Sequence, residues 1–354
     1  MKKQRIGILT AGGDCPGLNS TIRAIVKTAR EKYNMETIGF MHGYQGILTG
    51  EYRELTSSRV SGILTKGGTI LGTSREKPFS DEGIKAGHPE KIKQVYDDLE
   101  LDCLLTLGGN GTQKTAHKLS VQQDMSVIGL PKTIDNDIYG TEICFGFYSA
   151  VDIATEAIDR IHTTAHSHNR IMVVEIMGHH TGWLALYSGV AGGGDVILIP
   201  EIPYDVDVIA KSIEKRSQAG KEFSIVAVAE GALSLEEAAL SKKEFKEKRS
   251  GETSIGYRIA KEIEVATGLE SRLTVLGYVQ RGGSPSPQDR ILSTKMGAFA
   301  VDMVKNKEYG RMVAMRNGKI VSLDLEEVAG KIRYVPQDDP ILKAGRNIGT
   351  CFGD

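Results

Sequence analysis

The sequence has few of the residues that stabilise small secreted or metal-binding folds. It contains only four cysteines, and these show no CxxC pair and no metal-ligand spacing. A disulfide-rich scaffold and a zinc module are therefore excluded. We expect a reduced, cytoplasmic protein.

Long apolar runs and net charge are missing too. No apolar stretch approaches the roughly 20 residues that a membrane-spanning helix needs. The formal net charge is −1, with 44 Lys+Arg against 45 Asp+Glu, so no basic surface for nucleic acid or an anionic membrane is indicated. We therefore expect no nucleic-acid partner and no membrane partner.

Glycine, by contrast, is abundant. It accounts for 41 of 354 residues, against a usual frequency of about 7%. Many of these glycines directly follow apolar, strand-like segments. Because glycine lets backbone N–H groups come close to an anion, this distribution predicts phosphate-binding loops.

Short apolar segments alternate with helical patterns along the first part of the chain. The expected strands are Ile6–Leu9, Thr37–Phe40, Asp102–Leu107 and Ser126–Leu130, and the expected helices lie near Leu18–Tyr33, Pro89–Leu99 and Thr112–Gln123. This order of strand and helix predicts an α/β fold with a mainly parallel, doubly wound sheet.

A second series of the same kind follows. It begins with a helix near Ser149–Ala165 and continues through strands near Ile171–Ile176, Val196–Ile199, Ser224–Ala229 and Leu273–Tyr278. Since 354 residues also exceed the usual size of one core, we predict two similar Rossmann-like lobes with the active site in the cleft between them. One lobe would comprise 1–146 plus 281–333, and the other 147–280 plus 334–354, with a charged, solvated insertion at 235–252.

The segment Gly129–Asp137 concentrates reactive side chains directly after an expected strand. It contains Lys132, Thr133, Asp135 and Asp137. Ligands of open α/β sheets bind beyond the carboxyl ends of the strands. One carboxylate there can take the proton of an attacking hydroxyl, a second can hold Mg²⁺, and the lysine can neutralise phosphate charge. The combination predicts phosphoryl transfer.

Three glycine-rich loops, each expected directly after a strand, would lie beside this segment along one edge of one sheet. The first, 10–19, follows the first strand and precedes a helix, where backbone N–H groups favour an anion. The second, 67–75, ends in Arg75, whose guanidinium can fork onto phosphate oxygens. The third, 108–112, again joins a strand to a helix. Together the loops are a more specific signal than each one alone.

Polar residues also accompany the strands of the second lobe. The backbone after the strand near Ile171–Ile176 and several arginines suit a sugar phosphate. The pair His166 and His168 lacks cysteine or carboxylate partners in any zinc pattern, and the adjacent His179 and His180 are expected to point apart, so no dedicated metal site is expected there. The candidates for sugar-phosphate binding are Arg170, Met177, Gly178, Glu230, Arg272 and Arg281.

Assembled in this order, the motifs resemble those of the phosphofructokinase family. The match runs from Gly7 to about Asp302 and is most specific in 12–23, 67–75, 131–137 and 275–289. The resemblance implies transfer of a phosphoryl group to the 1-hydroxyl of fructose 6-phosphate, with Mg²⁺ as cofactor. It also implies a homo-oligomer, and we expect a homotetramer because the sugar site would borrow arginines across an interface.

The resemblance further implies roles for individual residues. Asp135 would be the general base, Thr133 and Arg75 would stabilise the migrating phosphoryl group beside Lys132, and Asp137 with Asn110 would handle Mg²⁺. The donor would be held by Gly13, Tyr44, Arg75, Gly108, Gly109, Asn110, Gly111 and Thr112. Fructose 6-phosphate would be held by Thr133, Asp135, Met177, Gly178, His179, Glu230, Tyr278 and Arg281, and by Arg170 and Arg272 of a neighbouring subunit.

Two positions that sort donors in this family disagree here. Glycine at both positions accompanies ATP, whereas aspartate and lysine accompany pyrophosphate, and this chain has Gly111 and Lys132. A carboxylate at 111 would crowd and repel the α-phosphate of a nucleotide, so its absence favours ATP. A reversible, pyrophosphate-dependent enzyme is the alternative.

Asn110 stands where the family usually has an acidic residue. A neutral amide gives the metal ion less negative charge than a carboxylate would.

Two more distant functions stay open. A nicotinamide-nucleotide or lipid kinase would share a loop like 108–112 but would lack the arginines of the second lobe. A catalytically silent sugar-phosphate sensor would bind fructose 6-phosphate without turnover. The presence of both Asp135 and Asp137 argues against the sensor.

Overall fold

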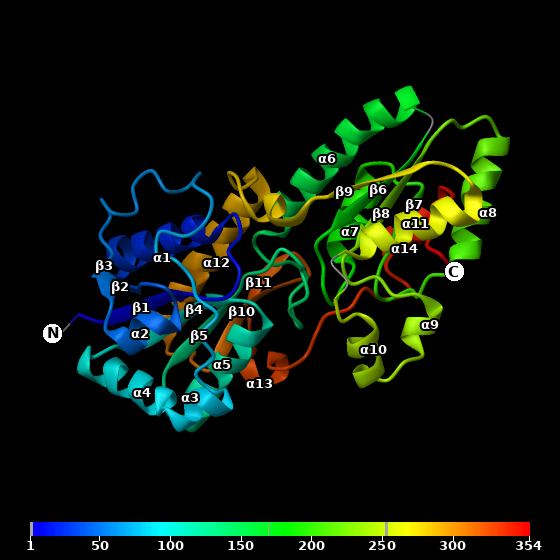
Figure 1. The fold of residues 1–354 in the computed structure, drawn as a ribbon. Helices are drawn as coiled ribbons and strands as arrows, with labels where there is room; N and C mark the ends of the chain where they lie inside the picture. The colour runs from blue at the N-terminus through cyan, green and yellow to red at the C-terminus, as the bar shows by residue number, and fades with distance from the viewer. Residues whose placement is uncertain (1–2, 169, 252–253) are drawn as a thin grey trace. The chain divides into compact units, whose positions relative to one another are not determined.

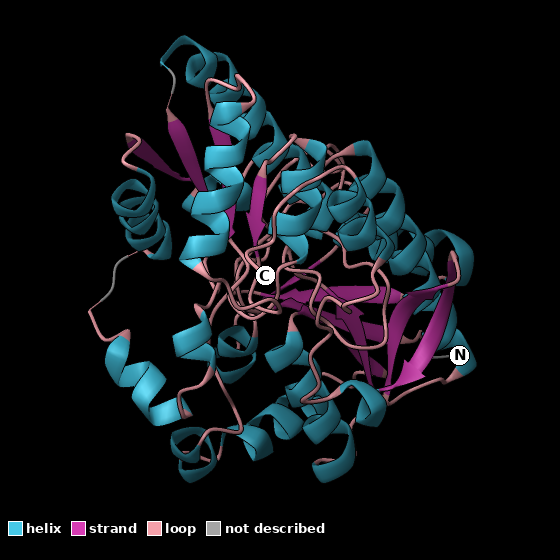
Figure 2. Ribbon diagram, turned by 90° about the vertical axis from the view of Figure 1, so that its right-hand side faces the viewer, coloured by secondary structure: helices cyan, strands magenta, loops and turns pink. Residues whose placement is uncertain are grey.

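The computed structural model describes residues 3–168, 170–251 and 254–354. The chain forms two compact units, which we call the first and the second unit (Figure 1). The first comprises Met1–Ser149 and Arg281–Arg333, and the second Ala150–Gln280 and Tyr334–Asp354. In each unit helices flank a mainly parallel sheet, which confirms the predicted α/β class (Figure 2).

The sheet of the first unit has seven strands in the order β11-β10-β5-β4-β1-β2-β3. The edge strands β3 and β11 are antiparallel to their neighbours, and the other pairs are parallel. The bounds are β1 Arg5–Thr10, β2 Glu36–Phe40, β3 Tyr52–Glu54, β4 Cys103–Gly108, β5 Val127–Pro131, β10 Arg311–Arg316 and β11 Lys319–Asp324.

The helices of the first unit include a tightly packed pair, α1 and α12. A Cβ atom at Gly297 of α12 would lie 2.9 Å from both Ala24 Cβ and Thr21 O of α1, so only glycine allows this approach. The bounds are α1 Leu18–Tyr33, α2 Tyr44–Thr49, α3 Asp81–Lys85, α4 His88–Asp98, α5 Asn110–Gln122, α12 Pro287–Asn306 and α13 Leu325–Val328.

The sheet of the second unit is parallel throughout, in the order β7-β8-β6-β9. All six residues of β8 are buried, as expected for a strand covered on both faces. The strands are β6 Ile171–Ile176, β7 Val196–Leu198, β8 Ser224–Ala229 and β9 Ser271–Val275; the longer helices are α6 Phe147–His168, α7 Trp183–Ala191, α8 Val206–Gln218, α11 Ile255–Thr267 and α14 Pro340–Asn347. Among the described residues, no helix is long and apolar enough to cross a membrane.

The predicted strand Leu273–Tyr278 is wrong in its second half. The strand ends at Val275, and Gly277–Arg281 form a 3-10 helix that starts with Gly277 at φ 50°. The prediction assumed that the apolar residues of this run are buried in the sheet. Val275 and Tyr278 are instead 49% and 75% exposed.

The charged insertion consists of two short helices, α9 Leu235–Ala238 and α10 Lys242–Lys248, and its last predicted residue, Glu252, lies outside the described residues. Each helix begins with a capping box, made by Ser234 with Glu237 and by Ser241 with Glu244. These reciprocal hydrogen bonds satisfy backbone groups that a helix start leaves free. They explain how so polar a segment forms helices.

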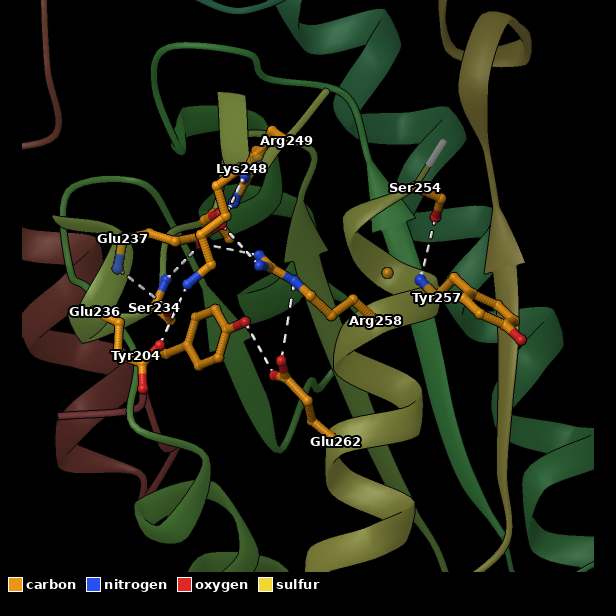
Figure 3. A network of polar contacts seen from close by, with 12 residues as sticks. Tyr204, Ser234, Glu236, Glu237, Lys248, Arg249, Ser254, Tyr257, Arg258 and Glu262 are labelled. Atoms are coloured by element: carbon orange, nitrogen blue, oxygen red, sulfur yellow. Dashed lines mark hydrogen bonds and ion pairs between the residues drawn. The ribbon is translucent and has the colours of Figure 1, made fainter. Parts of the chain in front are cut away.

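The insertion is not wholly solvated, which corrects the prediction. The side chain of Glu237 is 0% exposed and accepts hydrogen bonds from Arg249 Nη2 (2.9 Å) and Arg258 Nη1 (2.7 Å) (Figure 3). Burial alone would raise the pKa of Glu237, but the hydrogen bonds from the arginines outweigh it and hold that pKa far below its usual range. Glu237 therefore fastens the insertion to α11.

Replacing Glu237 with Gln should lower the free energy of unfolding by about 3 kcal/mol, because two partly buried arginines would lose their counter-charge. Its neighbour Glu236 is 85% exposed and pairs with Lys248, so Glu236→Gln should change stability by less than about 0.5 kcal/mol. Urea unfolding of both variants checks this. Equal losses of unfolding free energy in the two variants would show that Glu237 does not hold the insertion in place.

Candidate active site

The carboxyl ends of β1, β4 and β5 lie level at one edge of the first sheet. Thr10 pairs with Leu107, and Gly108 pairs with Pro131. Directly beyond the last pair, Lys132 N donates to Gly108 O (3.1 Å). The loops that follow these three strands therefore start side by side, as the sequence predicts.

The second glycine-rich loop, Gly67–Arg75, follows no strand in the described residues, which corrects the prediction that such a loop ends a strand. It is joined to the loop after β1 by hydrogen bonds instead. Gly12 N donates to Ser74 O (3.1 Å), and Thr73 Oγ1 donates to Gly12 O (2.5 Å). The loop thus reaches the same sheet edge, with Arg75 exposed.

Lys132 is turned towards the loop after β1. Its side chain is buried, its ammonium donates to Gly13 O, and burial lowers its pKa. Arg281 lies against the same loop, because a Cβ atom at Gly13 would be only 2.7 Å from Arg281 Nη1. Arg281 Nη1 also donates to Asp14 O (3.3 Å). The absence of a side chain at Gly13 therefore lets Arg281 approach this loop, to which Lys132 also donates.

Asn110 and Asp137 meet through a hydrogen bond from Asn110 Nδ2 to Asp137 Oδ2 (2.7 Å). Burial, and then the nearby charge of Asp135, raises the pKa of Asp137 to about 6. In the same segment, the Asp135 backbone N–H donates to Thr133 Oγ1 (3.0 Å). Three of the predicted catalytic residues, Thr133, Asp135 and Asp137, therefore share one short loop next to Asn110.

This neighbourhood fits Mg²⁺. Asn110 Oδ1 is buried and has no hydrogen-bond partner among the described residues, and it lies next to the carboxylate of Asp137. Those residues contain no cluster of three or more histidine, cysteine or carboxylate groups that would form a complete metal cage. Mg²⁺ needs only a few ligand oxygens from the protein when phosphates and water supply its other ligands.

The loop Gly108–Thr112 has two kinds of glycine. A Cβ atom at Gly108 would lie 2.2 Å from Thr112 Oγ1, so packing requires glycine there. A Cβ atom at Gly111 would meet nothing within 4 Å. Packing does not explain Gly111, and open space lies in front of it.

Tyr44, predicted to contact the donor, lies in the hydrophobic core of the first unit. It is 2% exposed, and its hydroxyl has no hydrogen-bond partner among the described residues. Burial raises the pKa of this phenol. Its role towards the donor stays a prediction.

In the second unit, the ends of β6 and β8 bring several predicted sugar-binding residues together. Met177 N donates to Gln280 Oε1 (3.3 Å), and Glu230 N donates to Ile176 O (2.8 Å). Gly178 has φ 134°, a conformation that other residues rarely adopt. The ends of β6 and β8 therefore hold Met177, Gly178 and Glu230 close together. His179 comes directly after Gly178.

Arg170 and Arg272 lie at the opposite edge of this sheet. Arg170 directly precedes β6, and Arg272 pairs with Met172 near the start of that strand. Both arginines form ion pairs with Glu270, at 2.6 Å for Arg170. One copy of the unit thus does not bring these arginines to Met177, and their role in a neighbouring subunit stays a prediction. Tyr278 is exposed in the 3-10 helix.

Three residues that position the site were not found from the sequence. Gln280 is 0% exposed and holds Met177. Asp289 is also 0% exposed and accepts hydrogen bonds from Gly146 N (3.0 Å) and Ser149 N (2.8 Å). The third is Glu270, described above. The spacing of Asp289 after Ser286, typical of a helix start, was an available signal.

A mainly parallel sheet with glycine-rich loops, a buried lysine and an amide–carboxylate pair at one edge is typical of an α/β protein that binds phosphate. A family model described as Phosphofructokinase matches residues 5–304. The chain belongs to the phosphofructokinase family, which confirms the resemblance inferred from the motifs.

Individual relatives agree with this assignment. The chain is 57% identical to an ATP-dependent 6-phosphofructokinase of Spirochaeta thermophila, covering 98% of this chain and 97% of that protein. It is 48% identical to a pyrophosphate–fructose 6-phosphate 1-phosphotransferase of Amycolatopsis mediterranei, covering 94% and 96%. It also superimposes on the structure of phosphofructokinase from Saccharomyces cerevisiae with a TM-score of 0.80 at 31% identity, covering 92% of this chain and 45% of that one.

The raised pKa of Asp137 has a measurable consequence. A folded-state pKa of about 6, above the ordinary 3.8, means that ionisation of Asp137 destabilises the fold as pH rises through that window. Asp137→Asn removes this effect, so its stability relative to the unsubstituted protein should improve by about 1 kcal/mol from pH 5 to pH 8.

Denaturant unfolding at both pH values checks this, with Asp98→Asn as the control. Asp98 is exposed, so its substitution shows how much of the change comes from replacing a surface carboxylate. A pH-independent difference for Asp137→Asn would contradict the raised pKa.

Proposed function

We propose that this protein transfers the terminal phosphoryl group of ATP to the 1-hydroxyl of fructose 6-phosphate, giving fructose 1,6-bisphosphate and ADP. The observation that carries the proposal is the shared neighbourhood of Asp135, Asp137 and Asn110 at the edge where β4 and β5 end. Membership of the family and the name of the 57% identical relative support the same reaction.

Asp135 would accept the proton of the attacking hydroxyl as the phosphoryl group moves. Phosphoryl transfer depends mainly on positioning and on cations around the phosphate oxygens. Arg75, Thr133 and the buried Lys132 would supply donors around the migrating group. The hydrogen bond from the Asp135 backbone to Thr133 fixes the hydroxyl of Thr133 beside the base.

Asp137 and the free Oδ1 of Asn110 would hold Mg²⁺, which neutralises charge on the donor phosphates. Asp137 must be ionised for this task, so the raised pKa favours metal binding above about pH 6. The neutral Asn110 keeps the ligand set weakly charged, as expected for an ion that arrives with the donor.

ATP is the favoured donor because the space in front of Gly111 is open. The open space suits the larger nucleotide. Lys132 does not separate the two donors, because its ammonium has three N–H groups and can bind phosphate of either donor while it donates to Gly13 O. Pyrophosphate is the second candidate, supported by the name of the 48% identical relative.

We also propose that the enzyme is a cytoplasmic homo-oligomer, and specifically a homotetramer. Met177 and Glu230 lie at one edge of the second sheet, whereas Arg170 and Arg272 lie at the other. A sugar phosphate can use both sets only if a second copy supplies the arginines.

Replacing Asp135 with Ser should lower kcat by about 10²- to 10⁴-fold, because the hydroxyl would lose its general base. The KM for fructose 6-phosphate should change little. The assay is the initial rate of fructose 1,6-bisphosphate formation, with the exposed Asp98→Ser as the matched control. A kcat near normal would contradict the role of Asp135 and leave the reaction without a base.

Replacing Gly111 with Asp should raise the KM for ATP by about tenfold or more, because a carboxylate would repel the nucleotide phosphates. Gly111→Ala is the matched control, since its methyl group enters open space and should leave KM within about twofold. Both variants should fold normally. If Ala harms ATP use as much as Asp, crowding rather than charge decides donor choice.

A further inference from the structure

A pocket of about 710 Å³ lies within the second unit, beyond the carboxyl ends of β6, β7 and β8. His179, Glu201 and Leu233 from the loops after these strands form part of its wall. The helix α10 of the insertion adds Phe245 and Lys246. We call this the α10 pocket. Its position is where parallel sheets bind ligands, and its volume is within the range of small-molecule sites.

The walls of the α10 pocket are rich in rings. Phe245, Tyr334, His179 and His180 all line it, and Tyr334 is 55% exposed. The two histidine rings lie edge to face at 4.5 Å between centroids. Flat ring faces of this kind favour stacking with a planar ligand.

The charges of the pocket point to an anion. Glu201 accepts hydrogen bonds from Gly182 N (3.0 Å) and Val335 N (3.0 Å), so its carboxylate is engaged by the backbone. Arg249 is engaged by Glu237 (2.9 Å). Lys246, in contrast, lines the pocket and forms no ion pair with a carboxylate among the described residues.

The ion pairs of Glu237 hold α10, which forms one wall of the pocket, in a fixed position. Glu237 holds Arg249 at the end of α10 and Arg258 of α11, and Tyr204 joins the same network through Glu262 (3.1 Å) (Figure 3). The helix that carries Phe245 and Lys246 is thereby fixed to the core of the unit.

We propose that the α10 pocket binds an organic phosphate that carries a planar ring, with the phosphate on Lys246 and the ring against Phe245 and Tyr334. The site is distinct from the residues assigned above to donor and sugar, apart from the shared wall at His179. It exists because of the insertion.

The pocket also touches the sugar loop, and this part of the inference rests on the proposed function. A Cβ atom at Gly231, which lines the pocket, would lie only 2.2 Å from His179 O, so the two backbones are in direct contact. Gly231 follows Glu230, and His179 follows Gly178. A ligand in the pocket should therefore steady this loop and lower the KM for fructose 6-phosphate by about fivefold, within the usual range of coupling between sites.

The test uses 1-naphthyl phosphate, which resembles neither ATP nor a sugar phosphate, with 1-naphthol and inorganic phosphate as its two halves. Isothermal titration calorimetry measures binding to the full chain. We expect the whole probe to bind more tightly than either half. Lys246→Ala should weaken it about tenfold, as expected for a lost hydrogen bond between charged groups, and leave 1-naphthol unchanged.

Lys243→Ala is the matched control, because Lys243 is exposed on the same helix and does not line the pocket. Circular dichroism of both variants checks that they fold. No binding of the probe at millimolar concentration, or equal weakening by both substitutions, would overturn the site.

Kinetics separate this inference from the proposed function. If the probe binds through Lys246 but the KM for fructose 6-phosphate does not move, the coupling is wrong and the site stands. If the protein forms no fructose 1,6-bisphosphate with either donor, the proposed function fails, and calorimetry still decides whether the site exists.

Tryptophan fluorescence gives a second measurement of binding. The sequence has one tryptophan, Trp183, and it follows Gly182, whose N–H donates to Glu201 in the pocket wall.

Discussion

The level register of β1, β4 and β5 is the constraint on which the candidate active site depends. These neighbouring parallel strands end together, so the polar residues that follow them must emerge side by side. Lys132 then reaches Gly13 O, and Asp137 reaches Asn110, although these residues are far apart in the sequence. A shift of β5 by one residue would disturb both contacts, because Lys132 and Asp137 both follow that strand.

The same rule bears on the sugar site that we propose in the second unit. Its parallel strands carry Met177 and Glu230 at one edge and Arg170 with Arg272 at the other. No local rearrangement brings residues from opposite ends of a strand together. Assembly with another copy is the direct way to unite them, so on this account quaternary structure and substrate binding are linked.

Much of this arrangement could be predicted because its signals are local. Strands such as β4 and β8 are continuous apolar runs, and glycines mark where they end. Residues that act across long sequence distances left weaker signals. Gln280 and Glu237 look like ordinary polar residues until the fold buries them, and Gly67–Arg75 reaches the site through hydrogen bonds to Gly12. The exposed apolar residues Val275 and Tyr278 gave a false strand signal for the opposite reason.

The most direct test of the account is the initial rate of fructose 1,6-bisphosphate formation from fructose 6-phosphate and Mg²⁺, measured in parallel with ATP and with pyrophosphate. The open space at Gly111 predicts turnover with ATP and little with pyrophosphate. Turnover with pyrophosphate alone would show that Lys132 decides the donor and would contradict the central claim.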